Sequence, residues 1–211
     1  MVARALHLVR HGEVFNPAGV IYGRLADFRL SDRGQAMATA AAEALADRPV
    51  TRVIASPLLR AQQSAAPIVQ RFGLSLQSDD RVIEAANVFE GRSTAGGALL
   101  RNPADWHYFA NPVRPGWGEP FSEILRRMRA AIADAFSGTE SGDVVIVSHQ
   151  LPIWTVHRSV VGRPLAHDPR RRRCALSSIT SFERRGGYLI ETAYADPGAA
   201  VTTEAQNEGA A

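Results

Sequence analysis

The sequence predicts an α/β domain in which helices cover both faces of a central, mostly parallel sheet, a three-layer sandwich. Short apolar runs occur at 6–9, 53–55 and 144–147, and runs of this kind are typical of strands buried on both faces. Helix-compatible segments follow the runs, and such alternation indicates a parallel sheet. With 211 residues, of which 45% are hydrophobic, the chain has the size and composition of one globular core.

Four segments have the composition and the end signals of helices: 31–47, 56–72, 119–136 and 151–161. Ser31 or Asp32 is the expected N-cap of the first helix, because short polar side chains accept hydrogen bonds from the free backbone amides of a helix start. Ser56 is the expected N-cap of the second helix, with Pro57 at its first position, where a missing N–H costs little.

The last part of the domain reads as a β-hairpin. Its strands are expected at 177–183 and 188–194, on either side of the turn residues 184–187. Because consecutive hairpin strands are antiparallel, this part of the sheet is the exception to its parallel order.

Two segments lack the periodicity of helices and strands. Residues 93–118 contain Gly, Pro and Asn, and we expect an insertion over one edge of the sheet, where loops often contact substrates. From Asp196 onward the residues are small and polar, which predicts a disordered tail. The expected organisation is one domain over 1–195 and a tail over 196–211.

Composition bounds the function classes. All 24 basic residues are arginine, and the net charge of +3 suits an anionic substrate but does not by itself indicate nucleic-acid binding. No run approaches the roughly 18 apolar residues of a membrane span, so a cytoplasmic protein is expected. Cys174 is the only cysteine, which excludes an internal disulfide. A homodimer is left open.

Polar residues follow three of the predicted strands at the point where each one ends. Arg10 and His11 follow the first run, Ser56 to Arg60 follow the second, and His149 follows the run at 144–147. Because ligands of open α/β sheets bind beyond the carboxyl ends of the strands, these side chains are expected to converge.

This set suits the chemistry of a phosphoryl group. Arginines such as Arg10 and Arg60 bind phosphate oxygens with permanent charge, and a neutral imidazole such as that of His11 can attack phosphorus. Gly12 is expected to let the chain turn tightly after His11. Glu84 is the candidate proton donor to the leaving group, since bound phosphate would raise the pKa of its carboxyl.

These motifs resemble the histidine phosphatase superfamily, in its phosphoglycerate-mutase-like branch. The resemblance covers roughly residues 4 to 195, and its motifs follow the family's order: Leu8-Val9-Arg10-His11-Gly12-Glu13, Tyr22-Gly23-Arg24-Leu25, Leu30-Ser31-Asp32-Arg33-Gly34, Ser56-Pro57-Leu58-Leu59-Arg60-Ala61, Glu84 with Phe89-Glu90-Gly91, and Val147-Ser148-His149. An Arg-His-Gly triplet alone would be weak support, but the joint occurrence of these motifs at strand ends is specific.

The resemblance implies a role for each site residue. It makes His11 the phosphorylated nucleophile and Glu84 the proton donor that later activates water. It places the phosphate in a pocket formed by Arg10, Arg60 and His149, and it places Asn16 and Gly23 near the phosphate or substrate. It also implies a small phosphorylated substrate and a reaction without metal or other cofactor.

Four departures from the family's pattern leave the catalytic set intact and leave the substrate open. Val14 stands where threonine is common, and the asparagine, Asn16, comes about one residue early. Asn87 replaces an expected glycine, and Gln150 follows the second histidine in place of glycine. Hydrolysis of a phosphomonoester is the main expectation. A phosphoglycerate mutase, which passes the phosphoryl group to a substrate hydroxyl, is the alternative. A non-catalytic phosphate-binding module is another, but binding alone would not need Glu84.

Other candidates receive plainer interpretations. Ser148 beside His149 could suggest a serine hydrolase, but the Gly-x-Ser-x-Gly motif is absent there. The run 170–173 is four arginines, which indicates a solvated loop, with a rim that steers anions or a nucleic-acid or partner contact as the alternatives. His7 is expected to be packed in its strand, and His107, His157 and His167 lack metal-ligand spacing, so no metal site is expected. Trp106 and Trp117 are expected to be packing or cleft residues.

Overall fold

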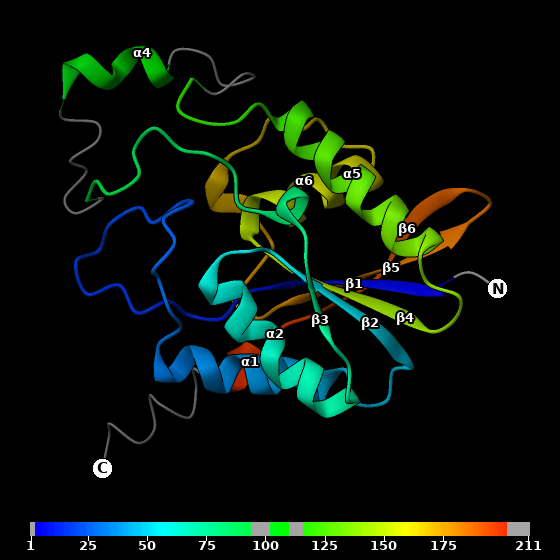
Figure 1. Cartoon of the computed structure of the whole chain (residues 1–211). Helices are drawn as coiled ribbons and strands as arrows, with labels where there is room; N and C mark the ends of the chain where they lie inside the picture. Colours follow the sequence, from blue (N-terminus) through cyan, green and yellow to red (C-terminus); the bar gives the residue numbers. More distant parts are fainter. Residues whose placement is uncertain (1–2, 94–101, 110–115, 202–211) are drawn as a thin grey trace.

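A six-stranded mixed sheet forms the centre of the protein in the computed structural model, which describes residues 3–93, 102–109 and 116–201 (Figure 1). Its spatial order is β3-β2-β4-β1-β5-β6. The strands are β1 (Ala5–Arg10), β2 (Val50–Ala55), β3 (Leu76–Ser78), β4 (Asp143–Ser148), β5 (Ile179–Arg185) and β6 (Tyr188–Ala195). The first four are mutually parallel where they pair, and β5 and β6 are antiparallel. The predicted fold class is confirmed.

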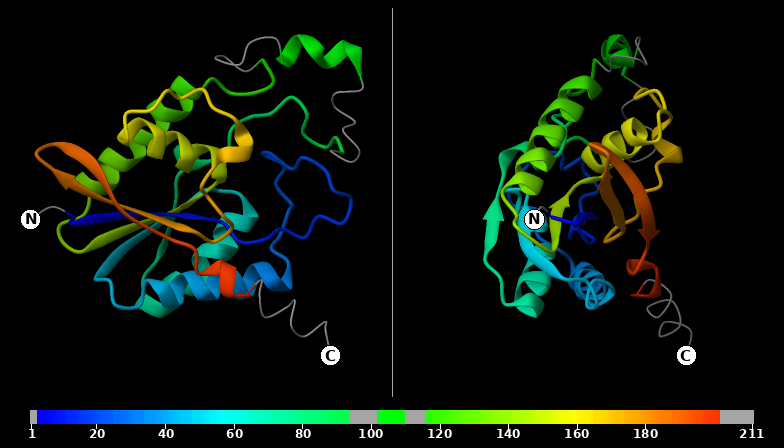
Figure 2. Two further views of the ribbon diagram at one scale, coloured as in Figure 1. Left: turned by 180° about the vertical axis from the view of Figure 1, so that it is seen from behind. Right: turned by 90° about the vertical axis from the view of Figure 1, so that its right-hand side faces the viewer.

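Helices cover both faces of the sheet, as Figure 2 shows. The elements on one face are α1 (Asp32–Ala44) and α2 (Leu59–Phe72), and those on the other are α5 (Phe121–Ser137) and α6 (Gln150–Val160). Successive strand residues point to opposite faces, so β4 serves both cores. Val145 and Val147 pack with α1 and α2, whereas Val144 and Ile146 pack with α5 and α6.

The helix starts differ in how well local signals predict them. Ser31 caps α1 as expected, and its hydroxyl accepts a hydrogen bond from the Gly34 amide at 2.9 Å. The expected Ser56 cap of α2 is wrong, because that helix begins at Leu59. Ser56 is fully buried, and its hydroxyl contacts His149 instead. A tertiary contact has therefore overridden the local capping signal.

The predicted hairpin is confirmed as β5 and β6, whose turn contains Gly186 and Gly187 at positive φ. The short strand β3, which the sequence did not predict, pairs in parallel with β2 at the sheet edge. The end of the domain also differs in detail from expectation. Residues 198–201 form a helical turn, in which Gly198 packs against Met37, so regular structure extends past 195.

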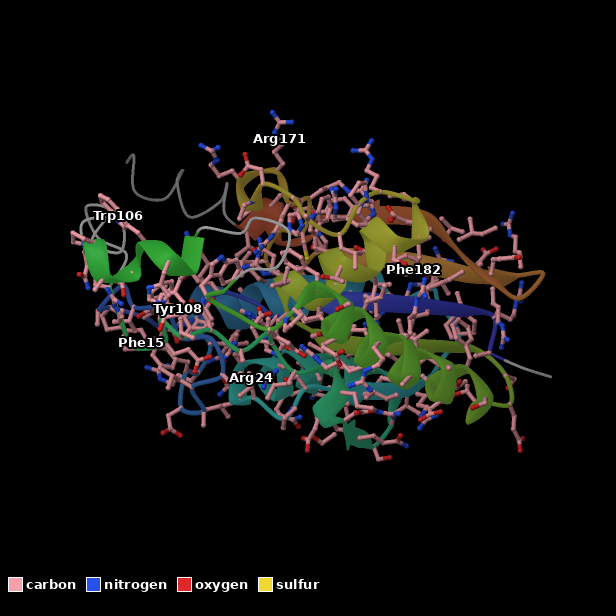
Figure 3. All side chains as sticks on the ribbon, turned by 90° about the horizontal axis from the view of Figure 1, so that it is seen from above. Phe15, Arg24, Trp106, Tyr108, Arg171 and Phe182 are labelled. Atoms are coloured by element: carbon pink, nitrogen blue, oxygen red, sulfur yellow. The ribbon has the colours of Figure 1, made fainter. Side chains whose placement is uncertain are left out.

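The insertion is described in part. It contains the 3-10 turn η3 (Pro103–Asp105) and the short helix α4 (Trp106–Phe109), which stands apart from the sheet beyond the carboxyl ends of the strands (Figure 1). Trp106 is exposed at this outlying position, as Figure 3 shows. Residues 94–101 and 110–115 lie outside the described part of the chain, as does 202–211 of the predicted tail. None of the described helices is long and apolar enough to span a bilayer.

Candidate active site

Four segments that are distant in the sequence bring their side chains together at the carboxyl edge of the parallel strands. His11 follows β1 directly, Arg60 lies in the first turn of α2, and His149 precedes the first residue of α6. Glu84 follows the 3-10 turn η1 (Asp80–Val82). The rings of His11 and His149 lie 5.1 Å apart, centroid to centroid. The structure therefore brings the two predicted histidines into one site.

His11 is held in one tautomer. Its Nδ1 donates a hydrogen bond to the carbonyl oxygen of Gly12 at 2.7 Å, so the lone pair is on Nε2. The pKa of His11 is well below 6.5, chiefly because the ring is buried and further because Arg10 and Arg60 carry positive charge. The ring is therefore neutral at neutral pH, the form that can act as a nucleophile.

His149 faces a different set of groups. Its Nε2 lies 2.8 Å from the hydroxyl of Ser56, and its buried Nδ1 has no hydrogen-bond partner among the described residues. Burial, and then the neighbouring His11 and Arg60, hold the pKa of His149 well below 6.5. A nearby anion would act in the opposite direction, because it stabilises the imidazolium form.

The two arginines of the site are held by backbone carbonyls and aromatic contact. Arg10 donates from Nη1 to Cys174 O at 2.6 Å, and Arg60 donates from Nη2 to Gly23 O. The guanidinium of Arg60 also lies 4.8 Å from the centre of the Tyr22 ring. In the described part of the chain, the Nε atoms of both arginines are buried without an acceptor. Since an unpaired buried donor costs about 1–3 kcal/mol, both atoms favour binding of an anionic oxygen.

Glu84 is the acidic group of the site. One of its carboxylate oxygens accepts a hydrogen bond from the Ala85 amide at 2.8 Å. Burial raises the pKa of Glu84, and this outweighs the opposing effects of the Ala85 hydrogen bond and the charges of Arg60 and Arg10. Glu84 also lines a cavity of about 190 Å³, together with Trp117 and Arg172. A raised pKa favours the acid form of a carboxyl, and an acid beside a cavity can donate a proton to a group bound there.

Gly12 and Gly34 let the motif at 8–13 pack closely against the motif at 30–34. A Cβ on Gly12 would lie 2.3 Å from the carbonyl oxygen of Gly34, and one on Gly34 would lie 2.0 Å from that of Glu13. The start of α1 therefore packs directly on the segment after His11. The expectation that Gly12 serves a tight turn needs correction, because φ of Gly12 is not in the left-handed region and close backbone contact is what excludes a side chain.

The two less specific sequence candidates have local roles in the structure. Both ends of the Asn16 amide are bonded to the backbone of Val20, at 2.9 and 3.2 Å, so this side chain closes its own loop. Gly23 has φ +35°, and a Cβ there would lie 2.3 Å from a carboxylate oxygen of Glu90. Its carbonyl holds Arg60, and it lines the cavity beside Glu84. Gly23 is therefore part of the site, whereas the side-chain hydrogen bonds found for Asn16 in the described part of the chain go to Val20 and not to the site.

Three further residues belong to the site and were not predicted in this role: Ser56, Tyr22 and Arg172. Ser56 and Tyr22 lie within recognised motifs, but only the folded chain shows their contacts with His149 and Arg60. Arg172 was grouped with its exposed neighbours in a run of arginines. No local signal in the sequence separates it from them.

The competing hydrolase interpretation fails on geometry. Ser148 is fully buried, and its hydroxyl donates to Val82 O at 2.7 Å. His7, as expected, is packed inside the sheet, where it bonds to Ser181 and Asp143. Among the residues that the structure describes, no group of three or more His, Cys, Asp or Glu side chains is arranged to hold a metal ion.

Comparisons with known proteins show the family to which the chain is similar. The family model of the histidine phosphatase superfamily (branch 1) matches residues 6–196. Uncharacterized protein Rv0525 of Mycobacterium tuberculosis is 49% identical, over 92% of this chain and 96% of that protein. A probable phosphoglycerate mutase GpmB of Erwinia tasmaniensis is 30% identical, over 89% and 91% respectively. The mycobacterial glucosyl-3-phosphoglycerate phosphatase Rv2419c superposes with a TM-score of 0.72 at 25% identity, over 90% of this chain and 96% of that chain.

Proposed function

The chain belongs to the histidine phosphatase superfamily, branch 1, and from that premise we propose that it hydrolyses a phosphomonoester through a phosphohistidine on His11. The observation that carries the proposal is the state of His11. Its Nδ1–H is committed to Gly12 O, and the ring is neutral beside the charges of Arg10 and Arg60. A neutral imidazole next to two guanidinium groups combines a nucleophile with the charge that phosphoryl transfer requires.

In the first half-reaction, Nε2 of His11 attacks phosphorus and the ester P–O bond breaks. Arg10, Arg60 and a protonated His149 neutralise the phosphoryl oxygens. The leaving alkoxide takes the proton of Glu84, whose raised pKa favours the acid form before the reaction. The products of this step are the free alcohol, a Glu84 carboxylate and a phosphoryl group on His11.

In the second half-reaction, water attacks phosphorus and the N–P bond to His11 breaks. The Glu84 carboxylate takes a proton from this water, which returns it to the acid form. Inorganic phosphate leaves, and His11 is neutral again. The same guanidinium groups serve both steps, because the charge on the phosphoryl oxygens is similar in each.

A mutase would share the first half-reaction and differ in the acceptor. In that case a substrate hydroxyl, instead of water, takes the phosphoryl group from His11. The 30% identity with a probable phosphoglycerate mutase supports this second candidate, and the similarity to a phosphatase structure at 25% identity supports hydrolysis. The two activities are separated by supplying 3-phosphoglycerate with 2,3-bisphosphoglycerate and measuring isomerisation against phosphate release.

The proposal is tested by trapping the intermediate. Protein with EDTA present is mixed with a ³²P-labelled phosphomonoester and quenched within a turnover. We expect label that is stable to alkali and labile to acid, located on His11 by peptide mapping. His11→Ala should neither label nor turn over an aryl phosphate.

His107→Ala is the matched control, since His107 is an exposed histidine outside the site. It should label like the wild type. Steady turnover by His11→Ala, or label on a serine, would refute the nucleophile assignment.

A further inference from the structure

The four arginines at 170–173 have four different environments. Arg170 pairs with Asp168 at 3.0 Å in the turn η4 (Pro169–Arg171), and the Arg171 side chain points outward into solvent (Figure 3). Arg173 pairs with Glu191 and lies over the Tyr194 ring. Only Arg172 of this run lines the cavity beside Glu84. The expected solvated loop or rim therefore describes its neighbours but not Arg172.

Arg172 is held in place by two side chains. Its Nε donates to His167 Nε2 at 2.9 Å, and its Nη1 donates to Gln150 Oε1 at 3.3 Å. His167 can accept this bond because its Nδ1 donates to Leu165 O at 2.6 Å, which leaves the lone pair on Nε2. The His167 ring also packs against Phe121, with centroids 5.4 Å apart. The guanidinium is thus oriented before any ligand binds.

The charge of Arg172 is not balanced by a direct partner. No carboxylate among the described residues forms an ion pair with it, and its two hydrogen bonds use two of five N–H donors. The pKa of Arg172 is lowered, chiefly because burial disfavours its charge; Glu84 opposes this effect, and the charge of Arg10 adds to it. Holding a third guanidinium close to Arg10 is unfavourable unless an anion binds between them.

The position of the cavity shows which part of a substrate would meet Arg172. Its lining includes Glu84, Asn87, Trp117, Leu151 and Arg172, but not His11 or His149. Glu84 is the proposed proton donor to the leaving group. Tyr22 and Gly23, which contact Arg60, also line it. The cavity therefore adjoins the phosphate pocket at Arg60 and lies beside the proposed leaving-group acid.

We propose that Arg172, oriented by His167 and Gln150, binds a second anionic group on the alcohol part of the substrate. This inference rests on the proposed function and narrows the substrate class to phosphomonoesters whose alcohol carries a carboxylate or a second phosphate. A cavity of about 190 Å³ holds such a group with a few carbon atoms. Among the residues that line this cavity, Arg172 is the cationic one.

The test compares two substrates that differ in one group. 3-Phosphoglycerate carries a carboxylate where glycerol phosphate carries a neutral hydroxymethyl group. We expect the wild type to prefer 3-phosphoglycerate in kcat/KM, and Arg172→Gln to reduce this preference about 10- to 100-fold, the range for loss of a charge-assisted hydrogen bond. Arg172→Lys should restore part of it, because it keeps the charge but loses the planar fork. A bisphosphate substrate distinguishes a phosphate from a carboxylate as the preferred group.

Arg171→Gln is the matched control, since it removes the same charge from the neighbouring exposed position. It should leave the preference unchanged. An equal loss on both substrates in Arg172→Gln, with a wild-type melting temperature, would overturn the proposal.

A binding measurement separates this inference from the proposed function. In a His11→Ala background, Arg172→Gln should raise the Kd for 3-phosphoglycerate far more than the Kd for glycerol phosphate. An unchanged Kd ratio overturns the second anion site. An absence of turnover in the wild type with every phosphomonoester instead counts against the phosphatase activity, and the Kd ratio still tests Arg172.

Discussion

Ser56 Oγ lies 2.8 Å from His149 Nε2, although the two residues are 93 positions apart in the chain. Both side chains are fully buried, and the hydroxyl can donate to a neutral imidazole or accept from a charged one. This contact fixes the ring of His149 through both protonation states. The Ser-Pro pair that looked like a helix cap thus supports the second histidine of the site.

We expect Ser56→Ala to lower kcat/KM about tenfold. Without the hydroxyl, Nε2 of His149 loses its partner, and the imidazole ring is free to turn out of its orientation in the site. Steady-state kinetics with an aryl phosphate measures this. Ser137→Ala is the control, since the Ser137 hydroxyl bonds to Asp134 O on the exposed side of α5. A Ser56→Ala enzyme with unchanged kinetics would mean that His149 is held by other contacts.

Binding of an oxyanion should be accompanied by uptake of a proton at neutral pH. The pKa of His149 is well below 6.5 in the free protein, so the ring is neutral there. A bound phosphate or vanadate dianion raises that pKa, because it favours the charged imidazolium. Calorimetric titrations in buffers of different ionisation enthalpy measure the protons taken up.

His149→Asn should reduce this proton uptake, whereas His107→Asn, outside the site, should not. Equal uptake in the wild type and in His149→Asn would place the proton on another group.

Glu84→Gln should slow turnover most for substrates with poor leaving groups. Burial raises the pKa of Glu84, so its acid form persists toward neutral pH and is lost as the pH rises through that pKa. Alkyl phosphates need the proton that this form supplies, and aryl phosphates with stable leaving groups do not. We expect a loss of about 100-fold or more for alkyl substrates at the acid-dependent step, and a smaller loss for aryl substrates.

A series of phenyl phosphates of graded leaving-group pKa measures this dependence as a change of slope. Glu43→Gln, on the outer surface of α1, is the control. Parallel losses across the whole series would remove Glu84 from the role of general acid.

The folded state should lose stability as the pH falls below 6.5. His7 is buried between Ser181 and Asp143, and burial lowers its pKa despite the opposing effect of Asp143. Because the pKa of His7 is lower in the folded state, the unfolded chain binds a proton on this residue at a higher pH than the folded chain does. The contribution of His7 to the free energy of unfolding is therefore complete above pH 6.5, and it decreases as the pH falls. His11 and His149 act in the same direction.

Melting temperatures between neutral and mildly acidic pH, measured by calorimetry, check this expectation. His7→Gln should cost about 1–3 kcal/mol at neutral pH, because it disturbs two buried polar partners, and it should make the acid decline shallower. A decline of unchanged steepness in His7→Gln would show that other groups govern it.

The fold class and most of the site could be read from the sequence, because each depends on local patterns. Buried strands show as continuous apolar runs, and residues at the ends of parallel strands must meet at one edge of the sheet. His11, Arg60 and His149 were found in this way, and the structure places them together. The family resemblance added roles that periodicity cannot supply.

The remaining features depend on contacts between distant segments, which have no local signature. Ser56 carries a good helix-cap signal, yet a histidine 93 positions away uses its hydroxyl. Asn16 matches a family position, yet the backbone of its own loop satisfies its amide. Arg172 is one of four identical side chains in sequence, and only the packing of His167 and Gln150 turns it toward the cavity. The sequence thus determined which chemistry the edge of the sheet can support. The tertiary structure decided which side chains around that edge are buried, paired and charged, because burial and pairing arise only when separate segments of the chain meet.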